Sequence, residues 1–437
     1  MIRVALAAFT AALIALPVRA AVEIEEITTP GGFTAWLVQE DSIPFTALEL
    51  RFAGGTSLDL PGKRGAMNMM TLLLDDGSGD MEAQAFVEAR EALAARFSFE
   101  AYDDGLAISA QFLTEFRDES LALLRQAITE PRFDEAAMQR TRAQVIAGIR
   151  SEETDPDEIA RRTFDALAFG DHPYGSPSDG TVESVAALTR EDMVEAHARV
   201  FAKDRVHISA VGDVSADELA TILDELLGGL PETGAPELAV AEFQLEPGLT
   251  VVPFETPQSV AYFGHEGIAR DDPDFFPAFV ANEIFSGAGF ESRLMQEVRV
   301  KRGLTYGIGA SLVPKELGAL ILGRVGTVNA RMAETIEVVR DEWVRIAEEG
   351  VTQQELDSAI TYLTGAYPLR FDGNRRIAEI MVGMQVQDLP IDYIATRNDQ
   401  VRAVTLEDIR RVAARIYRPD DLHIVVVGQP EGLEASN

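Results

Sequence analysis

The sequence predicts an α+β protein made of two related halves. Stretches with the two-residue period of strands come in pairs and helical stretches come in runs, whereas parallel α/β proteins alternate the two regularly. A segment of 25 residues also occurs twice, at 188–212 and at 404–428. The chain has 437 residues, of which 46% are hydrophobic, so each half can bury a core of its own. We expect each half to be a mainly antiparallel sheet with helices packed on it.

Residues 1–20 have the pattern of a secretory signal peptide. Arg3 precedes an apolar stretch at 4–16, Pro17 interrupts it, and small residues stand three and one positions before Ala21. The apolar stretch is shorter than the roughly 20 residues that a membrane-spanning helix needs. We therefore expect cleavage before Ala21, a secreted, periplasmic protein and no membrane span in the mature chain; an uncleaved anchor is the alternative.

The first half is expected to span residues 21–229. Its strands and helices are placed where apolar residues recur with the period of a strand or of a helix. The predicted strands are 45–52 and 106–112, and the predicted helices are 81–96, 115–129 and 134–152.

The repeated segment closes each half. Its two copies align without gaps and share ten identical residues in 25 positions. Each copy predicts an amphipathic helix, with Thr189 or Thr405 as the N-cap and acidic residues in the first turn, followed by a short buried strand that ends in glycine.

A linker separates the halves. Residues 230–248 contain three prolines and show no clear periodicity, which is typical of a connecting segment. The second half is therefore expected to span 249–437, with a strand at 319–325 and a long helix at 330–349.

Charge and composition exclude several classes of function. The net charge is −34, with 38 basic and 72 acidic residues, so the chain would repel a nucleic-acid backbone. It contains no cysteine, which excludes disulfides, thiolate zinc sites and cysteine nucleophiles. The histidines available for metal binding or acid–base chemistry are His172, His197, His207, His265 and His423.

Residues 50–80 resemble the core of the insulinase/pitrilysin family of zinc peptidases. In that family a strand and a glycine-rich turn lead into a helix that carries His-x-x-Glu-His. The matching positions in this chain are Asn68, Met69, Met70, Thr71 and Leu72, so both histidines and the glutamate are replaced. The resemblance implies two half-domains that face each other, or a partner, across a chamber.

The replaced residues are unsuited to zinc chemistry. The resemblance places the family's distal glutamate ligand within 142–149, at or beside Gly148, and no acidic residue occupies that stretch. Neither Gly148 nor Leu72 offers a lone pair. Asn68 is a weak ligand alone, and Thr71 cannot act as a carboxylate general base toward a metal-bound water. We therefore predict that this chain holds no metal or other cofactor.

The second half resembles the family more closely. Residues 286–310 match its glycine-rich loop, the following helix and an Arg-Gly-Leu-x-Tyr turn, and the resemblance implies that Arg302 and Tyr306 bind substrate at the zinc site of the facing half or subunit. A guanidinium group can hold peptide carbonyls, and a phenol can donate a hydrogen bond to a developing oxyanion. Two structural alternatives remain open: Arg302 as a cation at a helix C-terminus capped by Gly303, and Tyr306 as a half-buried strand aromatic.

The histidines have plainer explanations than metal binding. His265 is interpreted as part of a turn after a strand that ends at Gly264, since no second histidine follows at ligand spacing. His207 and His423 occupy equivalent positions in the two repeats, which favours a packing or hydrogen-bonding role. His172 lies in a turn rich in glycine and proline, where a loop residue without a specific function is favoured over one that contacts substrate.

The resemblance implies a non-catalytic, substrate-binding subunit of a heterodimeric, exported zinc metallopeptidase that cleaves peptides. Its partner would be a homologous subunit that carries His-x-x-Glu-His and holds the zinc. The alternative is a structural scaffold subunit of the same fold without any role in turnover. Peptide cleavage by the assembled pair separates these two possibilities. Metal analysis of the isolated chain tests a third, an independently active hydrolase with a relocated site, which these residues support little.

Overall fold

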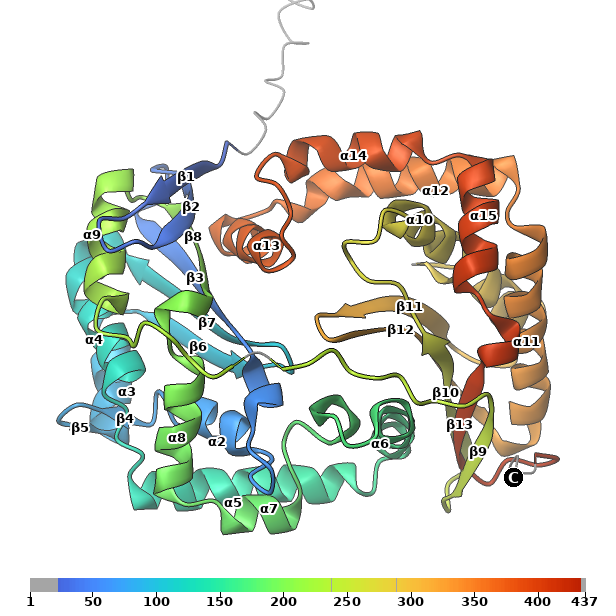
Figure 1. Cartoon of the computed structure of the whole chain (residues 1–437), viewed down its shortest axis with the longest axis horizontal. Coiled ribbons are helices and arrows are strands. Elements are labelled where there is room, and N and C mark those ends of the chain that lie inside the picture. The colour runs from blue at the N-terminus through green and yellow to red at the C-terminus, as the bar shows by residue number, and fades with distance from the viewer. Residues whose placement is uncertain (1–22, 237, 288, 434–437) are drawn as a thin grey trace, which may run out of the picture.

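The computed structural model describes residues 23–236, 238–287 and 289–433, and the signal peptide predicted at 1–20 lies outside them. Two β-sheets lie opposite each other, one in each half, and helices surround them (Figure 1). The predicted α+β class with two half-domains is therefore confirmed. Most strand pairs are antiparallel, as expected.

Within the described residues, the first sheet has six strands in the order β1-β2-β8-β3-β7-β6. Its β2 and β8 run parallel, and its other neighbours are antiparallel. The strands are β1 (Glu25–Thr28), β2 (Thr34–Gln39), β3 (Phe45–Ala53), β6 (Arg96–Ala101), β7 (Gly105–Leu113) and β8 (Val206–Gly212); a separate short pair is formed by β4 (Gly77–Ser78) and β5 (Met81–Glu82).

The second sheet repeats this topology. Across its described residues the order is β9-β13-β10-β12-β11, with β9 and β13 parallel, and each strand occupies the place of a first-sheet counterpart in the order β2-β8-β3-β7-β6. The strands are β9 (Gly248–Pro253), β10 (Gln258–Glu266), β11 (Ile308–Lys315), β12 (Gly318–Val328) and β13 (His423–Gly428).

The sequence repeat corresponds to one helix and one strand in each half. In the first copy α8 (Arg190–Val200) leads into β8, and in the second α15 (Leu406–Ile416) leads into β13. Thr189 and Thr405 each form a capping box, with Asp192 and Asp408 three residues on. The predicted caps, helices and buried strands are confirmed.

Helices cover the outer face of each sheet. The remaining helices of the first half are α2 (Ala66–Leu72), α3 (Ala83–Ala92), α4 (Arg117–Thr129), α5 (Glu135–Glu152), α6 (Pro156–Phe169), α7 (Val182–Ala187) and α9 (Ala216–Leu227). Those of the second half are α10 (Phe275–Ser286), α11 (Met332–Glu349), α12 (Gln353–Ala366), α13 (Asn374–Val386) and α14 (Tyr393–Ala403).

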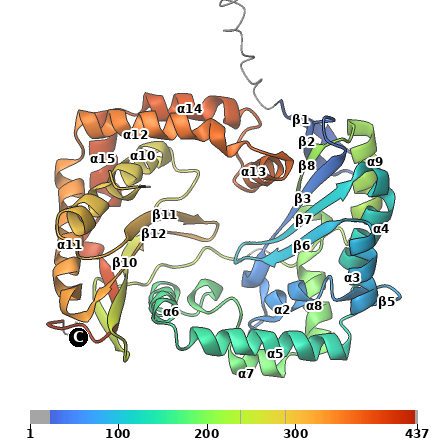
Figure 2. The ribbon, with the colours of Figure 1, turned by 180° about the vertical axis from the view of Figure 1, so that it is seen from behind.

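The halves exchange one helix each. Helix α6 of the first half packs on β10 and β13 of the second sheet, and α13 of the second half packs on β3 and β8 of the first sheet (Figure 2). In the α13 contact, Ser209 Oγ donates to the carbonyl oxygen of Ala378 at 2.7 Å, and Gln385 Nε2 donates to that of Ile208 at 2.7 Å. Each sheet is thus packed on both faces, and the second covering comes from the other half.

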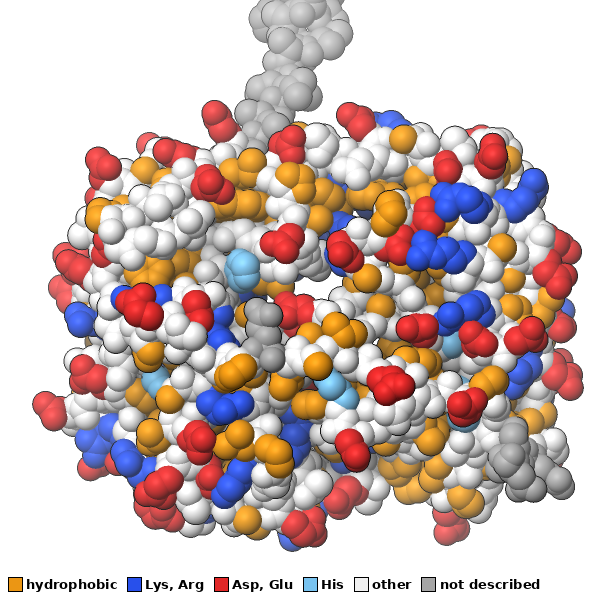
Figure 3. All heavy atoms as spheres, in the orientation of Figure 1, with side chains coloured by type: hydrophobic (Ala, Val, Ile, Leu, Met, Phe, Trp, Pro, Cys, Tyr) orange, Lys and Arg blue, Asp and Glu red, His pale blue; other side chains and the backbone are white. Residues whose placement is uncertain are grey.

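The space between the halves is partly open. Figure 3 shows this face of the molecule hollowed at its centre, with Asp and Glu side chains scattered over the surrounding surface. Because the two sheets lie on opposite sides of this hollow, side chains of both halves can face the same space.

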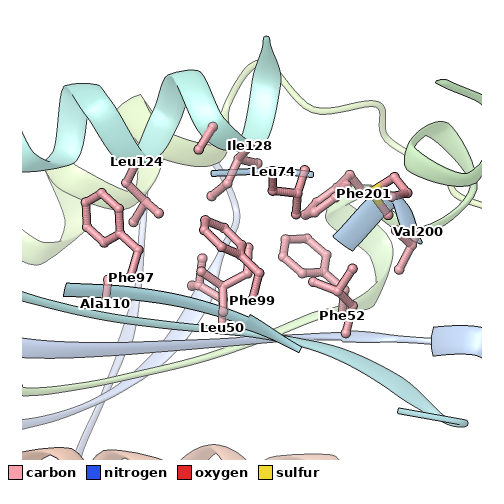
Figure 4. Packing of buried hydrophobic residues seen from close by; sticks show 14 of the residues in the cluster. Leu50, Phe52, Leu74, Phe97, Phe99, Ala110, Leu124, Ile128, Val200 and Phe201 are labelled. Atoms are coloured by element: carbon pink, nitrogen blue, oxygen red, sulfur yellow. The ribbon is translucent and has the colours of Figure 1, made fainter. Parts of the chain in front are cut away.

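The first half has a continuous core between its sheet and outer helices. Phe97 and Phe99 point from the sheet toward Leu124 and Ile128 of α4, and Phe52 points toward Phe201 (Figure 4). The second half has its own core around the fully buried Trp343. Burying aromatic and branched side chains is the main favourable contribution to folding, at about 1.5–3 kcal/mol for each large apolar side chain.

Two details differ from the sequence prediction. The helix predicted at 81–96 is shorter, because α3 ends at Ala92 and Arg96 begins β6. The turn predicted at His265 is wrong, because β10 continues through Glu266 and His265 is a buried strand residue. Nowhere in 23–236, 238–287 and 289–433 does a helix have the length and apolar character needed to span a membrane.

Candidate functional site

Helix α2 carries the positions that match the zinc motif, and a buried carboxylate holds its start. Gly65 precedes the helix with φ 92°, a left-handed conformation that glycine adopts without strain. Asp59 accepts hydrogen bonds from the backbone N–H groups of Gly65 at 2.8 Å and Met67 at 2.7 Å. Burial raises the pKa of Asp59 to about 6, although these hydrogen bonds oppose the rise.

The motif positions carry side chains with other partners or with none. Asn68 Nδ2 donates to Asp179 Oδ1 at 2.8 Å, and the buried Thr71 hydroxyl donates to the carbonyl oxygen of Met67 at 2.8 Å. The Leu72 side chain is 45% exposed. Gly148 lies on α5, which packs against α2, and a Cβ atom there would have open space around it.

These residues do not fit zinc. Leu72 and Gly148 offer no lone pair, the Thr71 hydroxyl is engaged by its own helix, and Asn68 presents only a neutral amide. Within the described part of the chain, no group of three or more His, Asp or Glu side chains could hold a metal ion.

All five histidines are partly or largely buried, and burial lowers the pKa of each. His265 shows the structural role most clearly: its Nε2 accepts from the indole N–H of Trp343 at 3.1 Å and from the backbone N–H of Arg418 at 3.2 Å. His423 lies at the equivalent repeat position to His207 and contacts Thr250 at 3.0 Å. These contacts link structural elements.

The turn that bears Arg302 and Tyr306 follows a short π-helix, η5 (Met295–Val300). The N–H of Gly303 donates to the carbonyl oxygen of Arg299 at 2.9 Å, and that of Leu304 donates to Val298 at 2.9 Å. Gly303 has φ 60°, so the helix ends at a left-handed glycine as the sequence predicts.

Arg302 is held by an ion pair at this helix end. Its Nη1 donates to the carbonyl oxygen of Glu297 at 2.8 Å and to Glu297 Oε2 at 2.6 Å. Lys301 also donates to Glu297. Burial alone would raise the pKa of Glu297, but the hydrogen bonds from these two cations lower it below its ordinary value. The guanidinium group therefore has a structural partner within its own chain.

The Tyr306 side chain projects into solvent more fully than that of Arg302. Its side chain is 88% exposed, and it precedes β11, which begins at Ile308. The alternative of a half-buried strand aromatic is therefore wrong. The turn around Tyr306 is fixed through its backbone, because Arg299 donates to its carbonyl oxygen while stacking on Phe290, with 4.6 Å from guanidinium carbon to ring centroid.

The structure places the two sets of predicted site residues in different halves. Helix α2 packs against β6 of the first sheet, whereas η5 packs against β11 and α11 of the second half. Within this chain Arg302 and Tyr306 therefore belong to a different structural unit from the positions of the zinc motif.

The hairpins that project from the two sheets meet between the halves. Lys315 Nζ donates to Asp103 Oδ2 at 2.5 Å, and the backbone N–H of Glu316 donates to Asp104 Oδ2 at 3.2 Å. The buried Tyr174 hydroxyl donates to Asp104 and accepts from the N–H of Leu317 at 3.1 Å. These contacts fix the relative position of the two sheets.

One group of polar residues was not predicted from the sequence. Arg270, Arg370 and Arg397 line a single cavity in the second half. They are spread over more than a hundred residues and belong to no motif, so no local signal marks them.

Two related families match the chain in succession. The description "Insulinase (Peptidase family M16)" matches residues 36–182, and "Peptidase M16 inactive domain" matches residues 187–363. The matched ranges together extend from β2 to α12, and the boundary between them falls just before α8.

Individual relatives include both inactive and peptidase-named proteins. The non-peptidase homolog YmxG of Helicobacter pylori is 25% identical over 88% of this chain and 89% of its own length. An uncharacterized zinc protease of Mycobacterium tuberculosis is 27% identical over 62% of this chain and 63% of its own. The crystal structure of a peptidase M16 inactive domain from Pseudomonas fluorescens superimposes with a TM-score of 0.87 and 28% identity, covering 94% of this chain and 99% of that one.

Proposed function

The chain belongs to the insulinase family of peptidases (peptidase family M16), and on that premise we propose that it is the non-catalytic, substrate-binding subunit of a heterodimeric, exported zinc metallopeptidase. Its substrates would be peptides. The partner would be a homologous chain that carries His-x-x-Glu-His and holds the zinc.

The observation that carries this proposal is the contrast between the two halves. The zinc-motif positions on α2 and α5 hold Asn68, Thr71, Leu72 and Gly148, none of which can replace a histidine or glutamate ligand. The turn before β11, in contrast, keeps Arg302 and presents Tyr306 to solvent. Similarity to a non-peptidase homolog and to an inactive-domain structure supports the same assignment.

Arg302 and Tyr306 are suited to act on a substrate held by another chain. The exposed Tyr306 phenol can donate a hydrogen bond to a peptide carbonyl or to the oxyanion that develops when the carbonyl is attacked. The Arg302 side chain is 39% exposed, and only its Nη1 is used in the contacts with Glu297. Its other nitrogen donors can therefore hold a substrate carbonyl while the ion pair fixes its position.

Export and partnership follow from separate observations. The signal-peptide pattern at 1–20 supports secretion to the periplasm. A partner is required because the substrate clamp and the metal-bound nucleophile would lie on different polypeptides and must be held in register.

The alternative is a scaffold subunit that assembles without any role in turnover. One observation favours it: Arg302 already has a complete structural explanation as a partner of Glu297 at a helix end. In that case Arg302 would stabilise its turn, and removing its side chain would affect folding without affecting the partner's chemistry.

The test is peptide cleavage by the complex. The purified chain is mixed with the homologous zinc-bearing chain, and turnover is compared for the native chain, Arg302→Ala and Tyr306→Phe, with assembly checked by size-exclusion chromatography. We expect each change to lower turnover by about ten- to a thousandfold, the usual cost of removing one group that stabilises a transition state. Tyr362→Phe is the matched control, because Tyr362 is an exposed tyrosine on α12.

The outcomes separate the two proposals. Loss of turnover in assembled Arg302→Ala and Tyr306→Phe complexes, with the Tyr362→Phe complex unchanged, supports substrate binding. Unchanged turnover in all three complexes supports the scaffold. Peptide cleavage by the isolated chain that a chelator abolishes would contradict both.

A further inference from the structure

A cavity of about 650 Å³ lies in the second half between α10, β11, α13 and α14. Its size falls within the range of about 300–1,000 Å³ that is typical of ligand pockets. Its walls are largely aromatic and aliphatic, and its charged lining residues are four arginines and one glutamate. The aromatic lining residues are Phe275, Phe276, Phe279, Tyr367 and Tyr393.

Three of these arginines lack an acidic partner. Arg376 pairs with Glu379 at 3.1 Å. Among the described residues, no carboxylate forms an ion pair with Arg270, Arg370 or Arg397. The whole chain has 72 acidic and 38 basic residues, so these three cations stand without a carboxylate partner in a chain where carboxylates outnumber cations. The cavity therefore concentrates positive charge in a molecule that is otherwise acidic.

Aromatic rings hold two of the guanidinium groups in place. The guanidinium carbon of Arg270 lies 4.3 Å from the ring centroid of Phe275, and that of Arg397 lies 4.5 Å from the ring centroid of Tyr367. Arg270 also donates to the Tyr393 hydroxyl at 2.9 Å. Arg397 is only 5% exposed. Arg270 Nε also donates to Gln387 Oε1 at 3.2 Å, and Arg397 Nη1 donates to the carbonyl oxygen of Leu363 at 2.9 Å. The donors of Arg270 Nη1 remain available to a carboxylate.

Arg370 is the exposed member of the group. It is exposed on η7 (Tyr367–Arg370), and no hydrogen bond or ion pair connects its side chain to another described residue. Its charge acts on both Tyr367 and Arg397, so it lies at the same end of the cavity. A free guanidinium group beside two fixed ones suits the capture of an anion from solution.

We propose that this cavity binds the C-terminal carboxylate of a peptide whose last side chain is aromatic or aliphatic. Arg270 and Arg370 would donate hydrogen bonds to the carboxylate, and the last side chain would pack against the phenylalanines of α10. The cavity contains neither Arg302 nor Tyr306. The inference rests on the proposed function for the class of substrate, and it adds the end of the peptide that this chain recognises.

The test uses the isolated full-length chain and fluorescence anisotropy. The probe is a labelled peptide that ends in Ala-Leu-Phe with a free carboxylate. It is compared with the same peptide as its C-terminal amide and with a version that ends in serine. We expect amidation and the change to serine each to weaken binding about tenfold or more, because each removes one of the two recognised groups.

Variants of the chain locate the binding. Arg370→Gln is exposed and should fold normally, and Arg270→Lys keeps the charge but loses the planar fork; each should weaken binding of the free acid about tenfold. The matched control is Arg402→Gln, because Arg402 is exposed on α14, pairs with Asp399 at 2.9 Å and does not line the cavity. Binding should be unchanged in this control.

Three results would overturn the proposal. The amide could bind as tightly as the acid, Arg402→Gln could weaken binding as much as Arg370→Gln, or inorganic phosphate or ATP could bind at Arg370 while the peptide acid does not. The last result would assign the cavity to a phosphate-bearing ligand. Because the assay requires no zinc-bearing partner, a failure here leaves the proposed function standing, and the absence of a partner leaves this binding measurable.

Discussion

At the scale of single residues, Glu49 shows how the exchanged helix changes the chemistry of a side chain. Glu49 lies on β3, whose sheet is covered at that point by α13, and its side chain is 1% exposed. Burial raises its pKa to about 7, although the Ser109 hydroxyl at 2.7 Å and Arg51 at 3.2 Å oppose the rise. Between pH 4.5 and about pH 7, Glu49 is therefore mostly protonated in the folded protein and mostly ionised in the unfolded chain.

This difference predicts how stability depends on pH. A carboxyl group with a raised pKa contributes stability that is fully present below its unfolded pKa, near 4.5, and is lost as the pH rises through about 7. At about 1.4 kcal/mol per pH unit, the contribution of Glu49 to this loss is on the order of 3 kcal/mol. In Glu49→Gln this component should be absent, so the variant should gain stability relative to the native chain as the pH rises from 4.5 to 7.

Urea denaturation at a series of pH values measures the effect. Glu100→Gln on β6 of the same sheet is the control of opposite sign, because a hydrogen bond from Tyr102 lowers the pKa of Glu100. That variant should lose stability relative to the native chain at neutral pH, with the difference shrinking as the pH falls. A constant difference between Glu49→Gln and the native chain over pH 4.5–7 would contradict the assignment.

Residue-scale predictions from the sequence succeeded where a local pattern decides the outcome. The glycine that ends η5 and the threonine caps were predicted because capping depends on neighbours a few residues away. His265 was predicted wrongly, since its burial depends on Trp343, 78 positions along the chain. The arginine cavity was missed for the same reason: Arg270 and Arg397 are brought together by tertiary packing alone.

At the scale of elements, α2 and α5 predict that a metal site can be rebuilt. Asn68 and Leu72 are four residues apart on α2, so their side chains lie on the same face of the helix. Gly148 on α5 has space for a side chain. We expect the triple variant Asn68→His, Leu72→His, Gly148→Glu to retain about one zinc ion per chain after dialysis, and the native chain to retain none.

Metal content by mass spectrometry and zinc titration by calorimetry provide the measurement. Gly148→Glu alone is the control, since a single added carboxylate cannot hold zinc at low concentration. If the native chain retained as much zinc as the triple variant, the account of α2 as a metal-free helix would be wrong. A triple variant that folds normally but binds no zinc would show that α2 and α5 are not positioned as a ligand pair.

The repeat made some elements predictable and left others open. Two copies of one helix–strand segment predicted α8 with β8 and α15 with β13, and hence two sheets of related topology. The partners of α6 and α13 could not be predicted, because an apolar helix face indicates burial without specifying which sheet covers it. Only the folded chain shows that each of these helices packs on the sheet of the other half.

At the scale of the whole molecule, the exchange predicts that both halves unfold together. Phe164 of α6 is fully buried in a cluster with Val425 and Val427 of β13, so Phe164→Ala removes packing from the second sheet although Phe164 belongs to the first half. A buried Phe→Ala change typically costs about 3–5 kcal/mol. Because the two halves are expected to unfold in one cooperative transition, this loss of unfolding free energy should be measured in both.

The two tryptophans of the chain allow the halves to be followed separately. Trp36 is buried beneath α13 on the first sheet, and Trp343 is buried in the second core. Fluorescence of Trp343→Phe reports the first half, and that of Trp36→Phe reports the second. Phe164→Ala should lower the denaturation midpoint equally in both backgrounds. Leu369→Ala, at a site 80% exposed, should change neither, and a midpoint that moves in one background only would contradict the coupling.

From the exchanged helices we also expect the peptide link between the halves to be unnecessary for holding them together. The segment 230–248 connects the two halves along the chain. In addition, α6 and α13 each bury an apolar face against the other half, which holds the halves together without that segment. A molecule nicked within this segment, for instance by a contaminating protease, should therefore migrate as two bands on a denaturing gel and still elute as one particle. The same property would let the protein be produced as two co-expressed fragments that dock into the native arrangement.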